Sequence, residues 1–117
     1  MTRTFQDELD EARTAQNAGE IGRARTCARR AVGKIMQEKI GIGPAPSDYA
    51  STYIDGLRRL ASDLRSPVSV REAAARLVDR SNKEYISASV DPVHDAEILL
   101  AFFVNQRGND HERLEKL

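Results

Sequence analysis

The sequence has one cysteine, no tryptophan and few aromatic residues, which make up 5% of its 117 residues. A lone thiol, Cys27, cannot close an intramolecular disulfide, so a disulfide-stapled secreted scaffold is excluded. Residues typical of strands are scattered and rarely alternate along the chain, so no sheet is expected. The core must therefore be built from Ala, Leu, Ile and Val, which suits closely packed helices.

An excess of one charge and long apolar runs are also missing. The chain has 18 basic and 18 acidic residues, so its net charge is zero. This balance gives no general attraction to nucleic acid or to an anionic membrane, and it removes one barrier to self-association. The longest apolar run, residues 98–104, is too short to cross a bilayer, and the charged N-terminus shows no signal-peptide core. We therefore predict a cytoplasmic protein, a homodimer, with no membrane contact.

Apolar residues recur at helical spacing in five segments separated by turn signals. The predicted helices cover about residues 5–18, 20–39, 48–66, 70–81 and 92–107. Gly19 ends the first, the Gly- and Pro-rich loop 41–47 follows the second, and Gly108 ends the fifth. The pattern predicts an all-α, antiparallel up-and-down bundle in one domain, residues 1–117, with 108–117 as a frayed polar tail.

Polar residues predict how the later helices begin. Either Ser47 or Asp48 caps the third helix, and Ser69 with Glu72 forms a capping box for the fourth. Asp91 caps the fifth, with proline at its first position. The inward faces are expected to carry Tyr53, Leu57, Leu60 and Leu64, then Val70, Ala74 and Leu77, then Ala96, Leu99, Leu100 and Phe103.

Three further points are left open by the sequence. Residues 82–90 fit a loop, a helix end or a short extended piece. Gly33 lies inside the second helix, either because another helix approaches it closely or as a tolerated interior glycine. Cys27 is either a thiol activated by neighbouring arginines or a small core residue, and the second reading is favoured.

The second helix carries five cations within twelve residues and no acid among them: Arg23, Arg25, Arg29, Arg30 and Lys34. Such a cluster is a candidate anion- or RNA-binding site, because guanidinium groups suit phosphates. The competing interpretation pairs these cations with the acidic first helix across an antiparallel hairpin. Pairing is favoured, because the first helix supplies nearly as many acids: Asp7, Glu8, Asp10 and Glu11.

His94 is the one weak candidate for a catalytic residue. It lies in the first turn of the last helix beside Asp91 and Asp95, where a general base or a solvated cap would both fit, and the cap is favoured. No set of ligands at helical spacing indicates a metal site. No phosphate-binding loop or Ser/His/Asp set is present, so no cofactor is expected and an enzyme is not favoured.

Residues 11–40, EARTAQNAGEIGRARTCARRAVGKIMQEKI, combine a short helix, a Gly turn and a long Ala-rich helix. This stretch resembles the opening hairpin of HEPN-type domains, and DPVHDAEILLAFFVNQ is similar to the last helix of that fold. The resemblance implies a bundle of four or five helices, commonly a homodimer, in a family that includes RNA-cleaving toxins and partners of nucleotidyltransferases.

Active members of that family carry an Arg-x4-6-His motif near the last helix. Here the nearest match, Arg107 and His111, has a shorter spacing and falls after the predicted end of the helix. His94 is better placed, but Arg80 lies too far before it. The resemblance thus implies a non-catalytic member. We predict a non-enzymatic, self-associating interaction domain that can also bind a protein partner, with a HEPN-like protein acting on RNA or nucleotides as the alternative.

Overall fold

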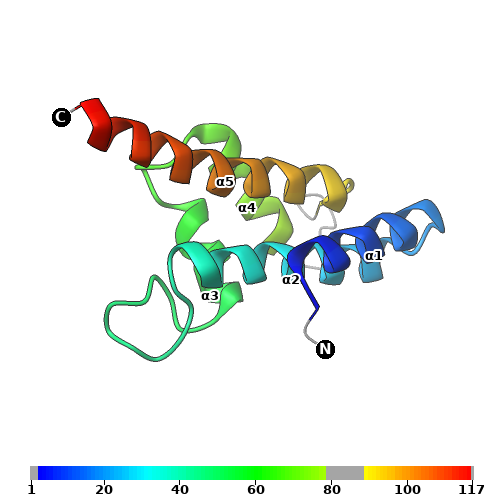
Figure 1. Ribbon diagram of the computed structural model, residues 1–117. Helices are drawn as coiled ribbons and strands as arrows, with labels where there is room; N and C mark the ends of the chain where they lie inside the picture. Colours follow the sequence, from blue (N-terminus) through cyan, green and yellow to red (C-terminus); the bar gives the residue numbers. More distant parts are fainter. Residues whose placement is uncertain (1–2, 79–88, 117) are drawn as a thin grey trace.

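The computed structural model describes residues 3–78 and 89–116, with side chains up to residue 105. These residues form five α-helices and, apart from one isolated bridge, no strand (Figure 1): α1 (Phe5–Asn17), α2 (Ile21–Lys39), α3 (Tyr53–Ala61), α4 (Val68–Val78) and α5 (Pro92–Lys116). Each helix packs on the next, and α5 also packs on α2 and α1. The predicted all-helical bundle of five helices is confirmed.

Helices α1 and α2 form an antiparallel hairpin. Thr4 caps α1: its Oγ1 accepts from the Asp7 N–H (3.1 Å), and the Asp7 carboxylate accepts from the Thr4 N–H (2.9 Å). Gly19, with φ of +80°, makes the turn at the predicted place, because this left-handed conformation favours glycine. The helices approach closely because their contact is built largely from buried alanines, including Ala12, Ala15, Ala24, Ala28 and Ala31.

Gly33 is where α3 approaches α2. A Cβ atom at Gly33 would lie 2.9 Å from the Cβ of Tyr53, so no larger residue fits without a shift. The close-approach interpretation of this glycine is confirmed. Gly41, with φ of +84°, follows α2, and its N–H donates to the carbonyl of Met36 (3.0 Å). The predicted loop begins here.

The third helix is shorter than predicted. Thr52 caps α3 by accepting from the Asp55 N–H (3.1 Å), whereas Ser47 and Asp48 lie in the preceding loop. The loop stays non-helical for longer because Asp48 accepts from the Ala45 N–H within it. Helix α3 ends at Ala61, so Leu64 is 82% exposed and its predicted inward position is wrong.

The fourth helix begins one residue before its predicted cap. Val68 is already helical, so Ser69 lies inside α4 and the predicted capping box with Glu72 is wrong. The N–H groups of Val70 and Arg71 donate to the carbonyl of Pro67 instead (3.1 and 3.0 Å). The predicted end of this helix at residue 81 and most of the ambiguous stretch 82–90 lie outside the described residues.

The fifth helix begins as predicted and ends later. The Asp91 carboxylate accepts from the His94 N–H (3.1 Å), which confirms Asp91 as the cap before Pro92. Helix α5 runs to Lys116, so its predicted end at Gly108 is wrong. An interior glycine costs only about 1 kcal/mol, and residues 112–116, ERLEK, are all helix-favouring, which opposes a break. Figure 1 shows the C-terminal end of α5 far from the α1–α2 turn.

The core lies where α5 meets α2 and α4. All four residues expected on the inner face of α5 are buried, as are Val70, Ala74, Leu77, Leu57 and Leu60. No helix of the described residues is long and apolar enough to cross a membrane.

Candidate functional site

The five cations of α2 do not form one patch. The Arg23 guanidinium pairs with Glu11 of α1 (3.1 Å) and with Glu20 (3.4 Å). Arg25 and Arg29 reach other segments: the Arg25 Nε–H donates to the carbonyl of Ser89 (2.6 Å), and an Arg29 Nη1–H donates to the carbonyl of Leu77 (3.0 Å). The predicted pairing with α1 thus holds for Arg23, while Arg25 and Arg29 link α2 to the segments around α4 and α5.

Arg30 and Lys34 belong to a surface that the other three cations do not share. With Tyr53 at the start of α3, they line a groove of about 370 Å³, which also includes Glu8, Gly33, Gln37 and Ile42. Two of the five predicted anion-binding residues therefore share one surface.

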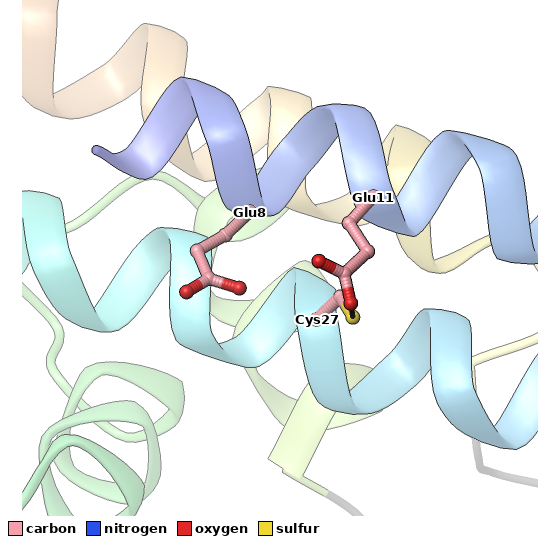
Figure 2. A group of neighbouring side chains, drawn as sticks. All are labelled: Glu8, Glu11 and Cys27. Carbon is pink, nitrogen blue, oxygen red and sulfur yellow. Dashed lines mark hydrogen bonds between the residues drawn. The ribbon is translucent and has the colours of Figure 1, made fainter. Parts of the chain in front are cut away.

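An acid–thiol group lies between α1 and α2. The carboxylates of Glu8 and Glu11 point from α1 towards α2, where the Cys27 thiol donates to Glu11 (3.7 Å; Figure 2). Their nearest ligand atoms all lie within 4.8 Å of one another, close enough to share a cation. Arg3 already bonds to both carboxylates and Arg23 to one of them. Their guanidinium groups supply the positive charge that a metal ion would bring.

Cys27 is a core residue in this group. It is 1% exposed, and burial together with the Glu11 carboxylate raises the pKa of its thiol. The interpretation of Cys27 as a core residue is confirmed, and activation by neighbouring arginines is not. The carboxylate lies close enough to oppose ionisation, whereas Arg23 has a smaller effect.

His94 lies on the exposed first turn of α5, and its imidazole forms no hydrogen bond or ion pair with the described residues. The neighbouring N-cap residue, Asp91, forms two hydrogen bonds. A hydrogen bond from the Gln16 side chain (2.9 Å) and the His94 N–H lower the pKa of Asp91. The geometry thus uses Asp91 to fasten α5 to α1. Arg107 and His111 both fall on α5, but their side chains lie outside the described residues.

A groove with a largely apolar lining lies between α1 and α5. It measures about 420 Å³, and its apolar lining comes from both helices: Phe5, Leu9, Leu100, Ala101 and Val104. Across its rim, the Arg13 guanidinium pairs with Asp10 on its own helix (3.0 Å) and with Glu97 of α5 (2.9 Å).

A second pocket, about 500 Å³ in volume, lies between loop 40–49, the α3–α4 turn and α5. Its polar wall is a network around Asp63, whose carboxylate accepts from the Tyr49 hydroxyl (2.9 Å) and from Arg65 (3.0 Å). Burial and the Asp63 hydrogen bond raise the pKa of Tyr49 to about 12. The sequence predictions missed this pocket. Its one local signal is the Asp-Tyr pair directly after the Gly- and Pro-rich loop.

Comparisons of the chain with protein-family models, with curated proteins and with solved structures found no significant match. The resemblance to HEPN domains therefore stays a prediction.

Proposed function

We propose that this protein is a non-enzymatic interaction domain that associates with a second copy of itself through the α1–α5 groove. The observation that carries the proposal is the apolar run at residues 98–104 of α5. Seven consecutive apolar residues make nearly two helical turns, so they point in every direction around the helix axis. A helix that is apolar all round is normally covered all round.

The bundle covers only part of this run. Leu99 and Phe103 are fully or almost fully buried against the core, at 0% and 3% exposure. Val104 is 52% exposed and Ala101 is also exposed. Both line the α1–α5 groove, so the uncovered side of the run and the groove are one surface.

A second copy suits this surface for three reasons. The rim carries both signs of charge, with Arg13 between Asp10 and Glu97, so a copy related by a two-fold axis can set the acids of one rim against the arginine of the other. The exposed Ala101 is small and lets a facing helix approach closely. The zero net charge of the chain adds no repulsion between copies.

Sedimentation equilibrium of the full chain across micromolar concentrations tests this proposal. We expect a monomer–dimer equilibrium that Val104→Glu weakens at least about 100-fold, because it places an unpaired charge in an apolar contact. The control is Val90→Glu, which changes a valine that is 79% exposed and does not line the groove. A monomer at all concentrations, or equal effects of the two variants, contradicts the proposal.

The HEPN-like alternative, a protein that acts on RNA or nucleotides, rests on Arg30, Lys34 and Tyr53. Two cations beside an aromatic ring are the elements that bind single-stranded nucleic acid. This alternative has less support, because Arg25 and Arg29 donate to backbone carbonyls rather than joining that surface. Single-stranded RNA binding that weakens steeply with salt and is lost in Arg30→Gln/Lys34→Gln would favour it. No binding at low salt would remove it.

A further inference from the structure

The pocket between loop 40–49, the α3–α4 turn and α5 shares no lining residue with the α1–α5 groove. A ligand in this pocket would therefore leave the self-association surface uncovered. The apolar part of its lining comes from three parts of the chain, with Ile40 after α2, Leu60 in α3 and Phe102 and Phe103 in α5. The two phenylalanine rings meet edge to face, with centroids 5.3 Å apart.

The acids on the wall of this pocket are already engaged. Asp63 Oδ1 accepts from the backbone N–H and the Nε–H of Arg65, both at 3.0 Å. Asp63 Oδ2 accepts from the Arg65 Nη2–H (3.0 Å) and the Tyr49 hydroxyl (2.9 Å). These four bonds occupy the lone pairs of the carboxylate, so Asp63 has no acceptor left for a ligand.

Asp48, the other acid of the lining, is turned into its own loop. One of its oxygens accepts from the Ala45 N–H (3.1 Å). Its two oxygens lie 2.5 and 2.9 Å from the positions where Cβ atoms of Gly41 and Gly43 would be. The carboxylate is thus packed against the glycine backbone.

The arginines of the wall, in contrast, keep unused donors. The Arg59 guanidinium lies 4.3 Å above the centre of the Tyr49 ring, and its Nη1 donates to the Tyr49 carbonyl. Its remaining N–H groups, and those on Nη1 of Arg65, meet no acceptor among the described residues. The stacking on Tyr49 fixes the plane of the Arg59 fork. Arg59 and Arg65 therefore offer charged donors that are not engaged by the described residues, while Asp63, the acid beside Arg65, is fully engaged.

We propose that this pocket binds a small carboxylate with a flat apolar body, with its carboxylate on Arg59 and Arg65 and its body against Phe102. A planar carboxylate matches the guanidinium fork. The wall holds two arginines and two aspartates, so its own charges balance and a singly charged anion is accepted more readily than a dianion. The pocket volume is in the range of small-molecule sites.

The test uses two probes with the same ring system. The full-length ¹⁵N-labelled protein is titrated with 1-naphthoate and, separately, with 1-naphthamide, which lacks the charge. We expect 1-naphthoate to shift the amide signals of Tyr49, Arg65 and Phe102 and to bind at least about tenfold more tightly than 1-naphthamide, because hydrogen bonds to charged groups are the stronger ones.

Neighbouring arginines provide the matched variants. Arg59→Gln should weaken 1-naphthoate binding about tenfold and leave 1-naphthamide binding nearly unchanged. The control, Arg58→Gln, removes an adjacent arginine that pairs only with Asp55 among the described residues and does not line the pocket. Equal affinity for the two probes, no binding at millimolar concentration, or shifts confined to another surface overturns the proposal.

Discussion

Arg76 of α4 and Asp95 of α5 form a forked ion pair at the edge of the core. The Arg76 Nη2 and Nε atoms lie 2.8 and 3.1 Å from Asp95 Oδ1, and the hydroxyl of Ser89 donates to Oδ2 of the same carboxylate. The two partners differ in burial: the Asp95 side chain is 4% exposed, whereas that of Arg76 is 41% exposed. The pair thus links α4 to α5, the helices that precede and follow residues 79–88 in the sequence.

This difference in burial predicts unequal effects of removing either partner. Arg76→Gln leaves a buried carboxylate without its cation and should lower the free energy of unfolding by about 2–4 kcal/mol. Asp95→Asn leaves an arginine that can turn to water and should cost about 1–2 kcal/mol. Urea unfolding followed by circular dichroism measures both. Equal losses of unfolding free energy in the two variants would show that burial of the Asp95 carboxylate does not determine the cost of breaking the pair.

Gly33 and Gly22 predict opposite effects of the same substitution in α2. Gly33→Ala gains helix propensity but places a methyl group 2.9 Å from Tyr53, so it should destabilise the protein. Gly22→Ala meets nothing within 4 Å and should stabilise the protein by up to about 1 kcal/mol. Thermal unfolding of the two variants gives the comparison. A stabilising Gly33→Ala would place α3 farther from α2.

Tyr49 and Asp63 predict a pH dependence at both ends of the range. Because the pKa of Tyr49 is raised to about 12, above the value near 10 of an unfolded tyrosine, its contribution is complete below about pH 10 and lost as the pH rises towards 12. Hydrogen bonds from Arg65 lower the pKa of Asp63. Its contribution is present above about pH 4 and lost as the pH falls.

The alkaline half of this prediction can be isolated with Tyr49→Phe. The difference in unfolding free energy between wild type and variant should shrink between about pH 10 and pH 12, because only the wild type loses the Tyr49 contribution there. Urea titrations at several pH values measure it. A difference that does not vary with pH would contradict the buried, hydrogen-bonded state of this phenol.

Cys27 predicts a thiol that reacts only when the hairpin opens. Because it is 1% exposed and its pKa is raised by burial, Ellman's reagent should modify the folded protein at least about 100-fold more slowly than the protein in urea. Cys27→Ser provides the blank. Rapid modification of the folded chain would mean that the α1–α2 contact is looser than its buried alanines indicate.

The fold was predictable where local chemistry decides it. The Asp91-Pro92 start of α5, the Gly19 turn and the close approach at Gly33 follow from the residues at those positions. The start of α3 could not be predicted in this way, because Ser47, Asp48 and Thr52 are all residues that cap helices well. The choice among them is made by hydrogen bonds within the loop, such as that from the Gly43 N–H to the Ala50 carbonyl.

The sites were less predictable because their partners lie far apart in sequence. The arginines of α2 could be identified as a cluster, but the acceptors of Arg25 and Arg29 are backbone carbonyls 64 and 48 residues away, and any residue type supplies those. Likewise, Tyr49 and Asp63 meet only because α3 turns back on the loop before it. The apolar run at residues 98–104 could be identified in the sequence. Which side of it the other helices leave uncovered could not be predicted, because that depends on how α5 packs in the bundle.

Self-association through the α1–α5 groove can be observed directly by isotope-filtered NOE spectroscopy on a mixture of ¹³C-labelled and unlabelled copies. Self-association predicts intermolecular NOEs from the methyl groups of Val104 to apolar side chains of the groove in the other copy. It also predicts that Val104→Glu abolishes them while Val90→Glu does not. The absence of intermolecular NOEs at millimolar concentration, or NOEs that map to another face, would contradict it.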